Sequence, residues 1–252
     1  MSGHNRRRIL NDRPVIGILV QLAREELTFR AKMYIAAPNV KHLESAGCRV
    51  TPVRLYLSES EYERIFYSIN GILLPGGAVD IQSSEFARVS GIFYRLAIQA
   101  GDRGDYFPVW GTCLGHQLLT ALTAGLNLLR LTDSGNAALP LHFTPEIKSC
   151  RMFRDFPPEM MRALGENSLT GHFHKYSITL DDFEANEKLR SFYRVVSTNT
   201  DPQGITFVST MEARKSLHCF ESREEEEAAL INSCIPTYVQ TKKCGRIIYK
   251  FD

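Results

Sequence analysis

The sequence predicts an α/β fold built on a mostly parallel sheet, and three observations lead to this class. Through the first half of the chain, short apolar runs typical of strands alternate with amphipathic runs typical of helices. With 252 residues, 44% of them hydrophobic, the chain is long enough to bury a full core. A glycine-framed cysteine follows the last of the early apolar runs. Because successive βα units form right-handed crossovers, we expect functional groups at the carboxyl ends of parallel strands.

The early elements follow from apolar runs and the turn residues beside them. Strands are expected at Val15 to Val20, Arg49 to Val53, Gly71 to Leu74 and Pro108 to Trp110. A helix is expected around Ala37 to Ser45, ending at Gly47. Another begins after Ser58, since Ser58 and Glu61 have the spacing of a capping box.

The later elements are less regular. A helix is expected from Ser83 to Gln99, because four apolar residues recur on one helical face. These are Phe86, Val89, Phe93 and Leu96. Beyond Gly125, short strands and turns are expected up to Thr170, followed by three strand-like runs, GHFHKYSITL, RVVSTNT and GITFVSTM. The run ESREEEEAALINSC is acidic and typical of a helical or solvated segment rather than a catalytic one.

Composition and charge limit the classes of function. A formal net charge of +2 gives no reason to expect nucleic acid as a partner, and no run approaches a membrane span. The six cysteines are scattered without the close pairs of a zinc site or a redox motif, and they are too sparse for a disulfide scaffold. The first apolar run, VIGILVQL, is short and typical of a strand rather than a secretion signal, which predicts a cytoplasmic protein if the sequence is complete.

The stretch FPVWGTCLGHQ, residues 107–117, has the pattern of a nucleophile elbow. Gly111 and Gly115 supply small neighbours for a sharp turn from a strand into a helix, and Cys113 lies between them. At a helix N-terminus the positive end of the helix dipole favours the reactive thiolate. The alternative is that Cys113 is one more buried small residue, but glycines on both sides are not what a packed core requires.

Two groups of backbone N–H donors are candidates for an oxyanion hole beside Cys113. One is the N–H of Leu114, directly after the cysteine, and the other is the loop LLPGGAVD, where Gly76 and Gly77 follow a neighbouring strand. The alternative for Gly76 and Gly77 is an ordinary turn. His172 and His174 alternate along a strand-like run and are expected on the same side, although a lone strand histidine is more often a satisfied polar or surface residue.

Longer stretches of the chain resemble the gamma-glutamyl hydrolase family, whose fold is related to class I glutamine amidotransferases. The stretches that carry the resemblance are VIGIL, YIAAPNVKHLESAGCRVTPVRL, SINGILLPGG, GDYFPVWGTCLG, LPLHFT, FHKYS, NEKLRSFYRVVSTNTD and ITFVSTME. The resemblance implies a three-layer α/β/α flavodoxin-like sandwich. It also implies folate poly-γ-glutamates as substrates, a Cys113 thioester intermediate and no metal or cofactor. Homodimers and residence in lysosomes or secretion are implied as well.

The chain departs from the family where the catalytic base is expected. The family carries its histidine in a Trp-His-Pro-Glu motif, whereas no His-Pro pair occurs in this sequence. After STME the chain continues directly into a stretch resembling the family's C-terminal tail, which contains His218 and Glu221 as a possible substitute pair. By resemblance, His174 is a secondary active-site residue. Gln117 matches the glutaminase form of the elbow, where the glutamine contacts the substrate, or else it simply opens the helix.

Three functions therefore stay open. The first is γ-glutamyl hydrolysis with His174 or His218 as the base. The second is a catalytically impaired variant that keeps the fold and the substrate pocket, and the third is a glutaminase-type amidotransferase domain. The expected organisation is an N-terminal extension over residues 1–13, a gamma-glutamyl hydrolase-like domain with a truncated C-terminal part over residues 14–212, and a tail over residues 213–252.

Overall fold

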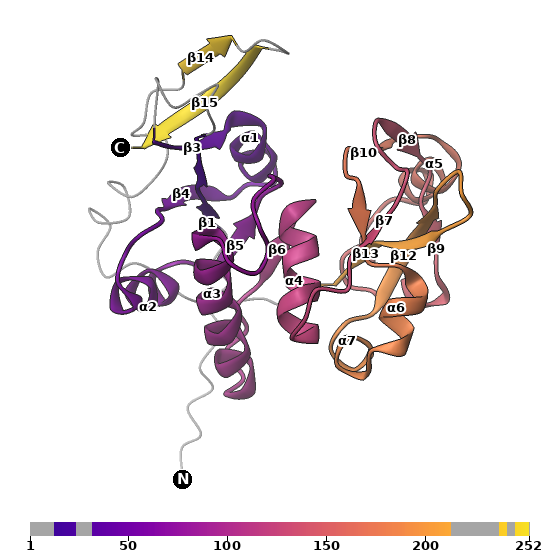
Figure 1. Cartoon of the computed structure of the whole chain (residues 1–252), viewed down its shortest axis with the longest axis horizontal. Helices are drawn as coiled ribbons and strands as arrows, with labels where there is room; N and C mark the ends of the chain where they lie inside the picture. Colours follow the sequence, from indigo (N-terminus) through magenta and orange to yellow (C-terminus); the bar gives the residue numbers. More distant parts are fainter. Residues whose placement is uncertain (1–12, 24–31, 213–236, 241–244, 252) are drawn as a thin grey trace. The chain divides into compact units, whose positions relative to one another are not determined.

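A parallel four-stranded sheet in the order β4-β1-β5-β6 is the central element of the fold (Figure 1). The computed structural model of the chain describes residues 13–23, 32–212, 237–240 and 245–251. The strands of the sheet are β1 (Val15–Leu19), β4 (Arg49–Val53), β5 (Gly71–Leu74) and β6 (Val109–Gly111). The flanking helices are α1 (Ala37–Ser45), α2 (Glu59–Ser68), α3 (Glu85–Asp102) and α4 (Leu114–Ala124). The expected α/β class with a mostly parallel central sheet is confirmed.

The register of the sheet brings the carboxyl ends of β5 and β6 together. β1 pairs in parallel with β4, residue 15 opposite residue 49, and with β5, residue 16 opposite residue 71. The Ile72 N–H donates to the Pro108 carbonyl, and the Thr112 N–H donates to the Leu74 carbonyl, both at 3.0 Å. The loop after β5 and the turn after β6 therefore start from adjacent points of the sheet.

Local signals set the ends of the early helices. The Ser58 N–H donates to Glu61 Oε2 at 2.9 Å and the Glu61 N–H to Ser58 Oγ at 3.3 Å, which completes the predicted capping box at the start of α2. Gly47, at φ +84°, follows α1, and Gly125, at φ +78°, ends α4. The four apolar residues predicted to share one face of α3 are all buried.

The chain after α4 forms small antiparallel sheets. Their orders are β13-β12-β9, β10-β8 and β11-β7. The strands are β7 (Arg130–Leu131), β8 (Ala137–Leu139), β9 (His142–Phe143), β10 (Thr170–His172), β11 (Tyr176–Ser177), β12 (Val195–Thr200) and β13 (Thr206–Met211). The helices are η1 (Pro145–Ser149), α5 (Pro158–Glu166), α6 (Leu180–Ala185) and α7 (Glu187–Phe192). The strands expected in RVVSTNT and GITFVSTM are confirmed as β12 and β13.

The single strand expected in GHFHKYSITL is wrong in part. β10 pairs with β8 and β11 pairs with β7, so the chain changes partners between the two short strands. His172 ends β10, whereas His174 lies in the connection before β11. Their placement depends on the pairing partners rather than on one continuous alternation.

A second four-stranded sheet, β14-β15-β3-β2, joins segments far apart in sequence. Its strands are β2 (Gln21–Leu22), β3 (Met33–Ala36), β14 (Thr237–Gln240) and β15 (Gly245–Phe251). β15 pairs antiparallel with β3, and both Ile248 and Phe251 are buried. Part of the expected C-terminal tail is thus paired strand, while the domain boundaries at residues 13 and 212 stay predictions.

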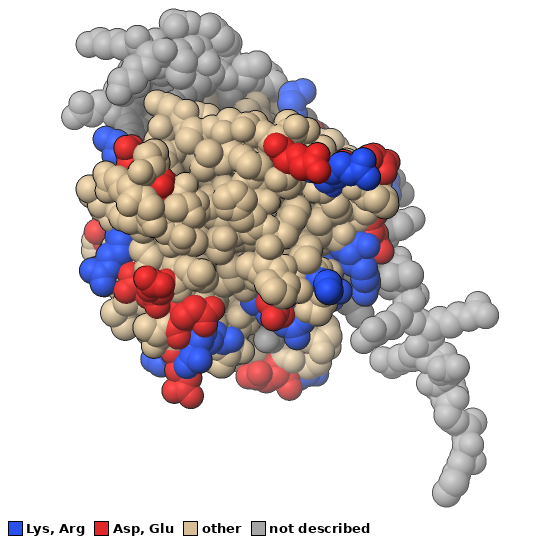
Figure 2. All heavy atoms as spheres, turned by 90° about the vertical axis from the view of Figure 1, so that its right-hand side faces the viewer, with Lys and Arg blue, Asp and Glu red and all other residues tan. Residues whose placement is uncertain are grey.

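Internal contacts group the chain into two compact units. One consists of residues 1–73, 95–109 and 215–252, and the other of residues 74–94 and 110–214, so the division runs through β5, α3 and β6. In Figure 2, acidic and basic side chains lie interspersed around an area that carries neither. Among the helices that the structure describes, none combines the length and apolar character needed to cross a bilayer.

Candidate active site

Two glycines allow the turn between β6 and α4 to pack against the end of β5. A Cβ placed on Gly115 would lie 2.0 Å from the carbonyl oxygen of Leu74. A Cβ placed on Gly111 would lie 2.5 Å from the carbonyl carbon of Gly115. No side chain fits at either distance, because both contacts are with backbone atoms that cannot move aside. The predicted need for small residues on both sides of Cys113 is confirmed.

Cys113 is the residue of this elbow with a strained backbone. Its backbone has φ +53° and ψ −109°, a conformation that non-glycine residues rarely adopt. It is the N-cap residue of α4, yet its side chain makes no capping hydrogen bond, and the residue is partly buried with a free thiol. Strained backbone of this kind concentrates at functional sites, where the surrounding structure holds a side chain in a required direction.

The loop after β5 lies directly against the Cys113 side chain. A Cβ placed on Gly76 would lie 3.1 Å from Cys113 Cβ and 3.7 Å from Sγ. Leu114 is the first residue of α4, and a first helical N–H has no acceptor within its own helix. The structure therefore places Gly76 against the cysteine, with the Leu114 amide directly after it, while the oxyanion role stays a prediction.

Gln117 ties the first turn of α4 to the histidine-bearing segment. Its side-chain Nε2 donates to the carbonyl oxygen of Tyr176 at 2.6 Å. Tyr176 therefore lies beside the first turn of α4, whose N-cap residue is Cys113. In this arrangement the amide nitrogen of Gln117 has a structural partner within the protein.

Buried hydroxyl groups surround the ring of His174. Its Nδ1 lies 3.2 Å from Ser134 Oγ and 3.1 Å from Ser177 Oγ. Ser134 Oγ also donates to the backbone carbonyl of His174 at 3.1 Å. Thr132 Oγ1 lies 2.9 Å from Ser177 Oγ, and all three hydroxyl residues are at most 4% exposed. A buried polar cluster of this kind fixes the orientation of the ring it surrounds.

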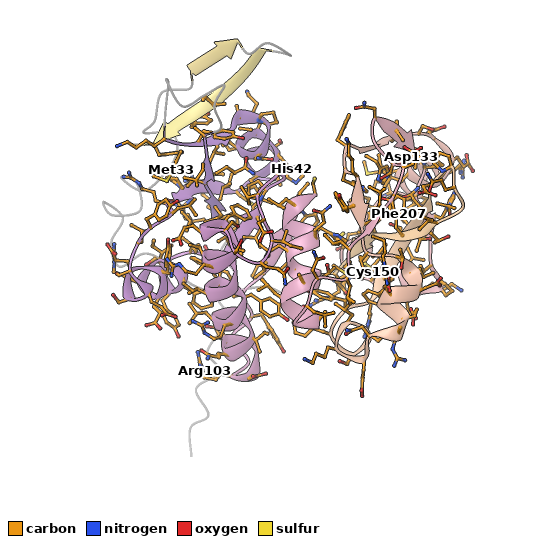
Figure 3. All side chains as sticks on the ribbon, viewed as in Figure 1. Met33, His42, Arg103, Asp133, Cys150 and Phe207 are labelled. Carbon is orange, nitrogen blue, oxygen red and sulfur yellow. The ribbon has the colours of Figure 1, made fainter. Side chains whose placement is uncertain are left out.

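His172 occupies the other side of the His174 ring. Its Nδ1 lies 3.2 Å from His174 Nε2, and the two ring centroids are 5.4 Å apart. Phe207, on β13, meets both imidazoles edge to face, at 5.5 Å and 5.6 Å. Figure 3 labels Phe207 within the unit that carries these strands. His172 itself is buried, and its Nε2 has no hydrogen-bond partner among the described residues.

Three imidazoles are held neutral near the first turn of α4. Burial and, to a smaller extent, the neighbouring His174 together lower the pKa of His116 to about 4. Burial also lowers the pKa of His172, again with a contribution from His174. Burial lowers the pKa of His174, although a hydrogen bond to the backbone of Tyr176 acts in the opposite direction. A neutral imidazole is the form that can accept a proton.

Asp201 supports this cluster indirectly, through a hydrogen bond to the backbone beside Ser134, and is not identified from the sequence. Its carboxylate accepts from the N–H groups of Asp133 at 2.9 Å, Gln203 at 2.9 Å and Ile205 at 2.8 Å. Burial alone would raise the pKa of Asp201, but these backbone donors lower it overall. Asp133, labelled in Figure 3, precedes Ser134, so Asp201 holds the loop that contacts His174. The turn sequence Asp-Pro-Gln-Gly was the available signal.

Neither the other candidate base nor a metal site is found among the described residues. His218 and Glu221, considered as a substitute pair, lie outside the described residues. Within the described ranges, no three His, Cys, Asp or Glu side chains are grouped so as to hold a metal ion. The part of the site that the structure describes is therefore a cysteine, backbone amides and a cluster of neutral histidines.

Comparisons with known proteins agree with this chemistry. Residues 14–138 match the Peptidase C26 family. The gamma-glutamyl hydrolase of Homo sapiens is 42% identical over 287 residues, covering 95% of this chain and 90% of its own length. That of Rattus norvegicus is 46% identical over 203 residues, covering 81% of this chain and 64% of its own length.

A solved structure supports the fold. The glutaminase domain of Trypanosoma brucei CTPS, determined with bound acivicin, superposes with a TM-score of 0.50 at 15% identity. The superposition covers 79% of this chain and 80% of the other.

The human match also contains positions that this chain lacks. Its 287 matched residues exceed the 252 residues of the whole chain, so at least 35 positions of the matched stretch have no counterpart here. This length difference agrees with the absence of a His-Pro pair from the sequence.

Proposed function

Because the chain belongs to the gamma-glutamyl hydrolase family, we propose that it cleaves γ-glutamyl bonds with Cys113 as the nucleophile. The observation that carries this proposal is the strained Cys113 at the N-terminus of α4, directly against Gly76. That geometry presents a thiol to a ligand while backbone amides lie beside it.

The reaction proceeds in two steps. The Cys113 thiolate attacks the γ-amide carbonyl, and the amine leaves with a proton, which gives a γ-glutamyl thioester. Water then attacks the thioester carbonyl, which releases the γ-glutamyl group as a carboxylic acid and returns the other proton of the water to the Cys113 sulfur. The N–H of Leu114 and the loop of Gly76 and Gly77 stabilise the oxyanion that forms in each step. The oxyanion-binding role of Leu114 and of the Gly76 loop is proposed because both lie beside Cys113.

His174 is the proposed proton acceptor. The hydrogen bond from Gln117 to Tyr176 holds the His174 segment beside the first turn of α4, and burial keeps the ring neutral. His218 is the alternative base, with Glu221 as its partner. An acid–base residue contributes about 10²- to 10⁴-fold to rate, so the identity of this group decides how fast the enzyme turns over.

The proposed substrates are folate and antifolate poly-γ-glutamates, on the basis of the sequence resemblance. Gln117 is proposed to contact the glutamyl group through its Oε1, since its Nε2 already bonds to Tyr176. Assembly as a homodimer and residence in lysosomes or outside the cell stay predictions.

A second candidate is a protein that binds γ-glutamyl ligands but is catalytically impaired. Two observations favour it: both ring nitrogens of His174 already have partners, and the human relative contains at least 35 matched positions without counterpart in this chain. Losing the base of a catalytic triad removes several orders of magnitude in rate.

One assay separates these candidates. The purified chain is incubated with a γ-linked folate polyglutamate beside a Cys113→Ala variant, and released glutamate is measured. We expect release that depends on Cys113. Binding of the substrate without release establishes the impaired variant instead. Turnover of free glutamine without cleavage of the polyglutamate establishes a glutaminase-type activity.

A further inference from the structure

His174 is held at both ring nitrogens by groups from different elements. Nδ1 faces the hydroxyls of Ser134 and Ser177, and Nε2 faces Nδ1 of His172 at 3.2 Å. A neutral imidazole has one N–H and one lone pair, so its partners determine which nitrogen carries the proton.

The Ser134 hydroxyl points to a proton on Nδ1 of His174. A carbonyl oxygen can only accept, so the contact from Ser134 Oγ to the His174 carbonyl at 3.1 Å uses the single proton of that hydroxyl. Ser134 Oγ then has only lone pairs left for the His174 ring. With the Ser134 proton directed at the carbonyl, His174 carries its own proton on Nδ1, and Nε2 holds the lone pair.

The same reasoning extends to His172. If His174 Nε2 is a lone pair, the contact between the rings needs an N–H on His172 Nδ1. His172 Nε2 is then a lone pair, which fits its burial without a hydrogen-bond partner among the described residues. A buried lone pair without a partner is tolerated better than a buried N–H without one.

We propose that His172 is a positioning residue. Its Nδ1–H donates a hydrogen bond to the lone pair of His174 Nε2 and thereby restrains His174 from acting as a base. The Nδ1–H of His172 occupies the only proton-accepting site of the neighbouring ring. Before His174 can accept a proton from Cys113 or another group, this hydrogen bond must break. The consequence for turnover rests on the proposed function, whereas the arrangement of protons does not.

Burial lowers the pKa of both rings, so the pair resists taking up a proton. An added proton ends on Nε2 of His172, which is buried without a partner among the described residues, and a second would set two N–H groups and two positive charges against each other. The titratable group that faces the pair from α4 is His116, and the facing ring from β13 is Phe207, which carries no charge. Asp201 contacts the backbone of Asp133 rather than either ring.

The first test measures proton positions in the full chain. Nitrogen-15 NMR of the histidine rings assigns the tautomers of His172 and His174 and follows their titration. We expect Nδ1–H on both rings of the wild-type protein. In a His172→Phe variant, which keeps a ring against Phe207 but has no donor, the pKa of His174 rises. His172→Asn is the matched control, since its amide nitrogen can stand where Nδ1 stood, and it keeps the wild-type titration.

Two NMR results would overturn the proposal. One is an Nε2–H tautomer of His174 in the wild-type protein. The other is an unchanged His174 titration in His172→Phe, with the Asn variant behaving in the same way. Because the tautomers are read in the wild-type chain, the proposal can fail even if the Phe variant does not fold.

The second test measures Cys113-dependent glutamate release from a γ-linked folate polyglutamate. We expect release to rise about fivefold in His172→Phe, the effect of losing one neutral hydrogen bond, and to rise less in His172→Asn, which keeps a donor. A loss of release in His172→Phe would overturn the restraining role. No release from any variant, together with the expected tautomers, would leave the positioning role standing and overturn the proposed function.

Discussion

The elbow that carries Cys113 and the segment that carries His172 and His174 are fixed in different ways. The elbow is fixed by backbone packing, since Gly111 and Gly115 meet other backbone atoms closer than any side chain allows. The histidine segment is held by side-chain hydrogen bonds, from the nearby Ser177 and from Ser134, 40 positions away in sequence. Nucleophile placement therefore rests on close backbone packing between α4 and the end of β5, whereas base placement rests on side-chain hydrogen bonds.

The largest effect is expected from Gly115→Ala, which tests the elbow. The added methyl group would lie 2.0 Å from the Leu74 carbonyl oxygen, so either α4 or β5 must move. We expect the free energy of unfolding, measured by urea denaturation, to fall by about 3 kcal/mol.

Gly91→Ala is the matched control for this change. Gly91 lies within α3, where an added Cβ would meet only Leu122 Cδ2, at an ordinary 3.5 Å. Alanine favours a helix over glycine, so this variant should gain up to about 1 kcal/mol. Equal losses in the two variants would show that the close packing of the elbow is not what stabilises it.

The contrast between the two regions also explains what the sequence predicts well. The elbow, the capping box at Ser58 and the helix end at Gly125 each depend on a few neighbouring residues, and the structure contains all three. The break between β10 and β11 depends on pairing with β8 and β7, which no local pattern records. Asp201 is likewise missed, because its role comes from a contact with Asp133, 68 positions away.

The next largest effect is expected from Asp201→Asn, which loosens the support of the histidine segment. The carboxylate accepts three backbone N–H bonds, and an amide would turn a donor toward one of them. We expect a loss of about 2 kcal/mol at neutral pH, typical of hydrogen bonds to a charged group. Denaturation of both proteins across a pH series measures the loss.

The pH dependence of this loss has a defined sign. The folded-state pKa of Asp201 is lowered, so its stabilisation is complete above the unfolded-state pKa and disappears as pH falls through the folded-state value. The difference between the wild-type and Asn proteins should therefore shrink only in acid. A difference that is constant down to the lowest pH would show that the charge of Asp201 does not contribute.

Gln117→Glu tests the link between the two regions and should have a smaller effect. The change replaces the N–H that Tyr176 accepts with a carboxylate oxygen, which repels the carbonyl. Because water can reach this bond, we expect a loss of about 1 kcal/mol in unfolding free energy. Gln117→Ala removes the donor without adding charge and serves as the comparison. If KM changes while stability stays constant in both variants, Gln117 contacts the substrate rather than joining the regions.

Arg130→Gln should have the smallest effect, because it changes an exposed ion pair at the edge of the histidine region. Arg130 Nε lies 2.9 Å from Asp182 Oδ2, with the arginine side chain 64% exposed. The hydrogen bond from Arg130 lowers the pKa of Asp182, with burial opposing it and Thr179 adding to it. Its removal should raise that pKa, measured by NMR, and lower Tm by less than about 2 °C. High salt should abolish the change in Tm, since solvent ions screen exposed pairs. A larger, salt-independent loss would mean that Arg130 supports the His174 segment through packing or hydrogen bonding rather than through its exposed charge.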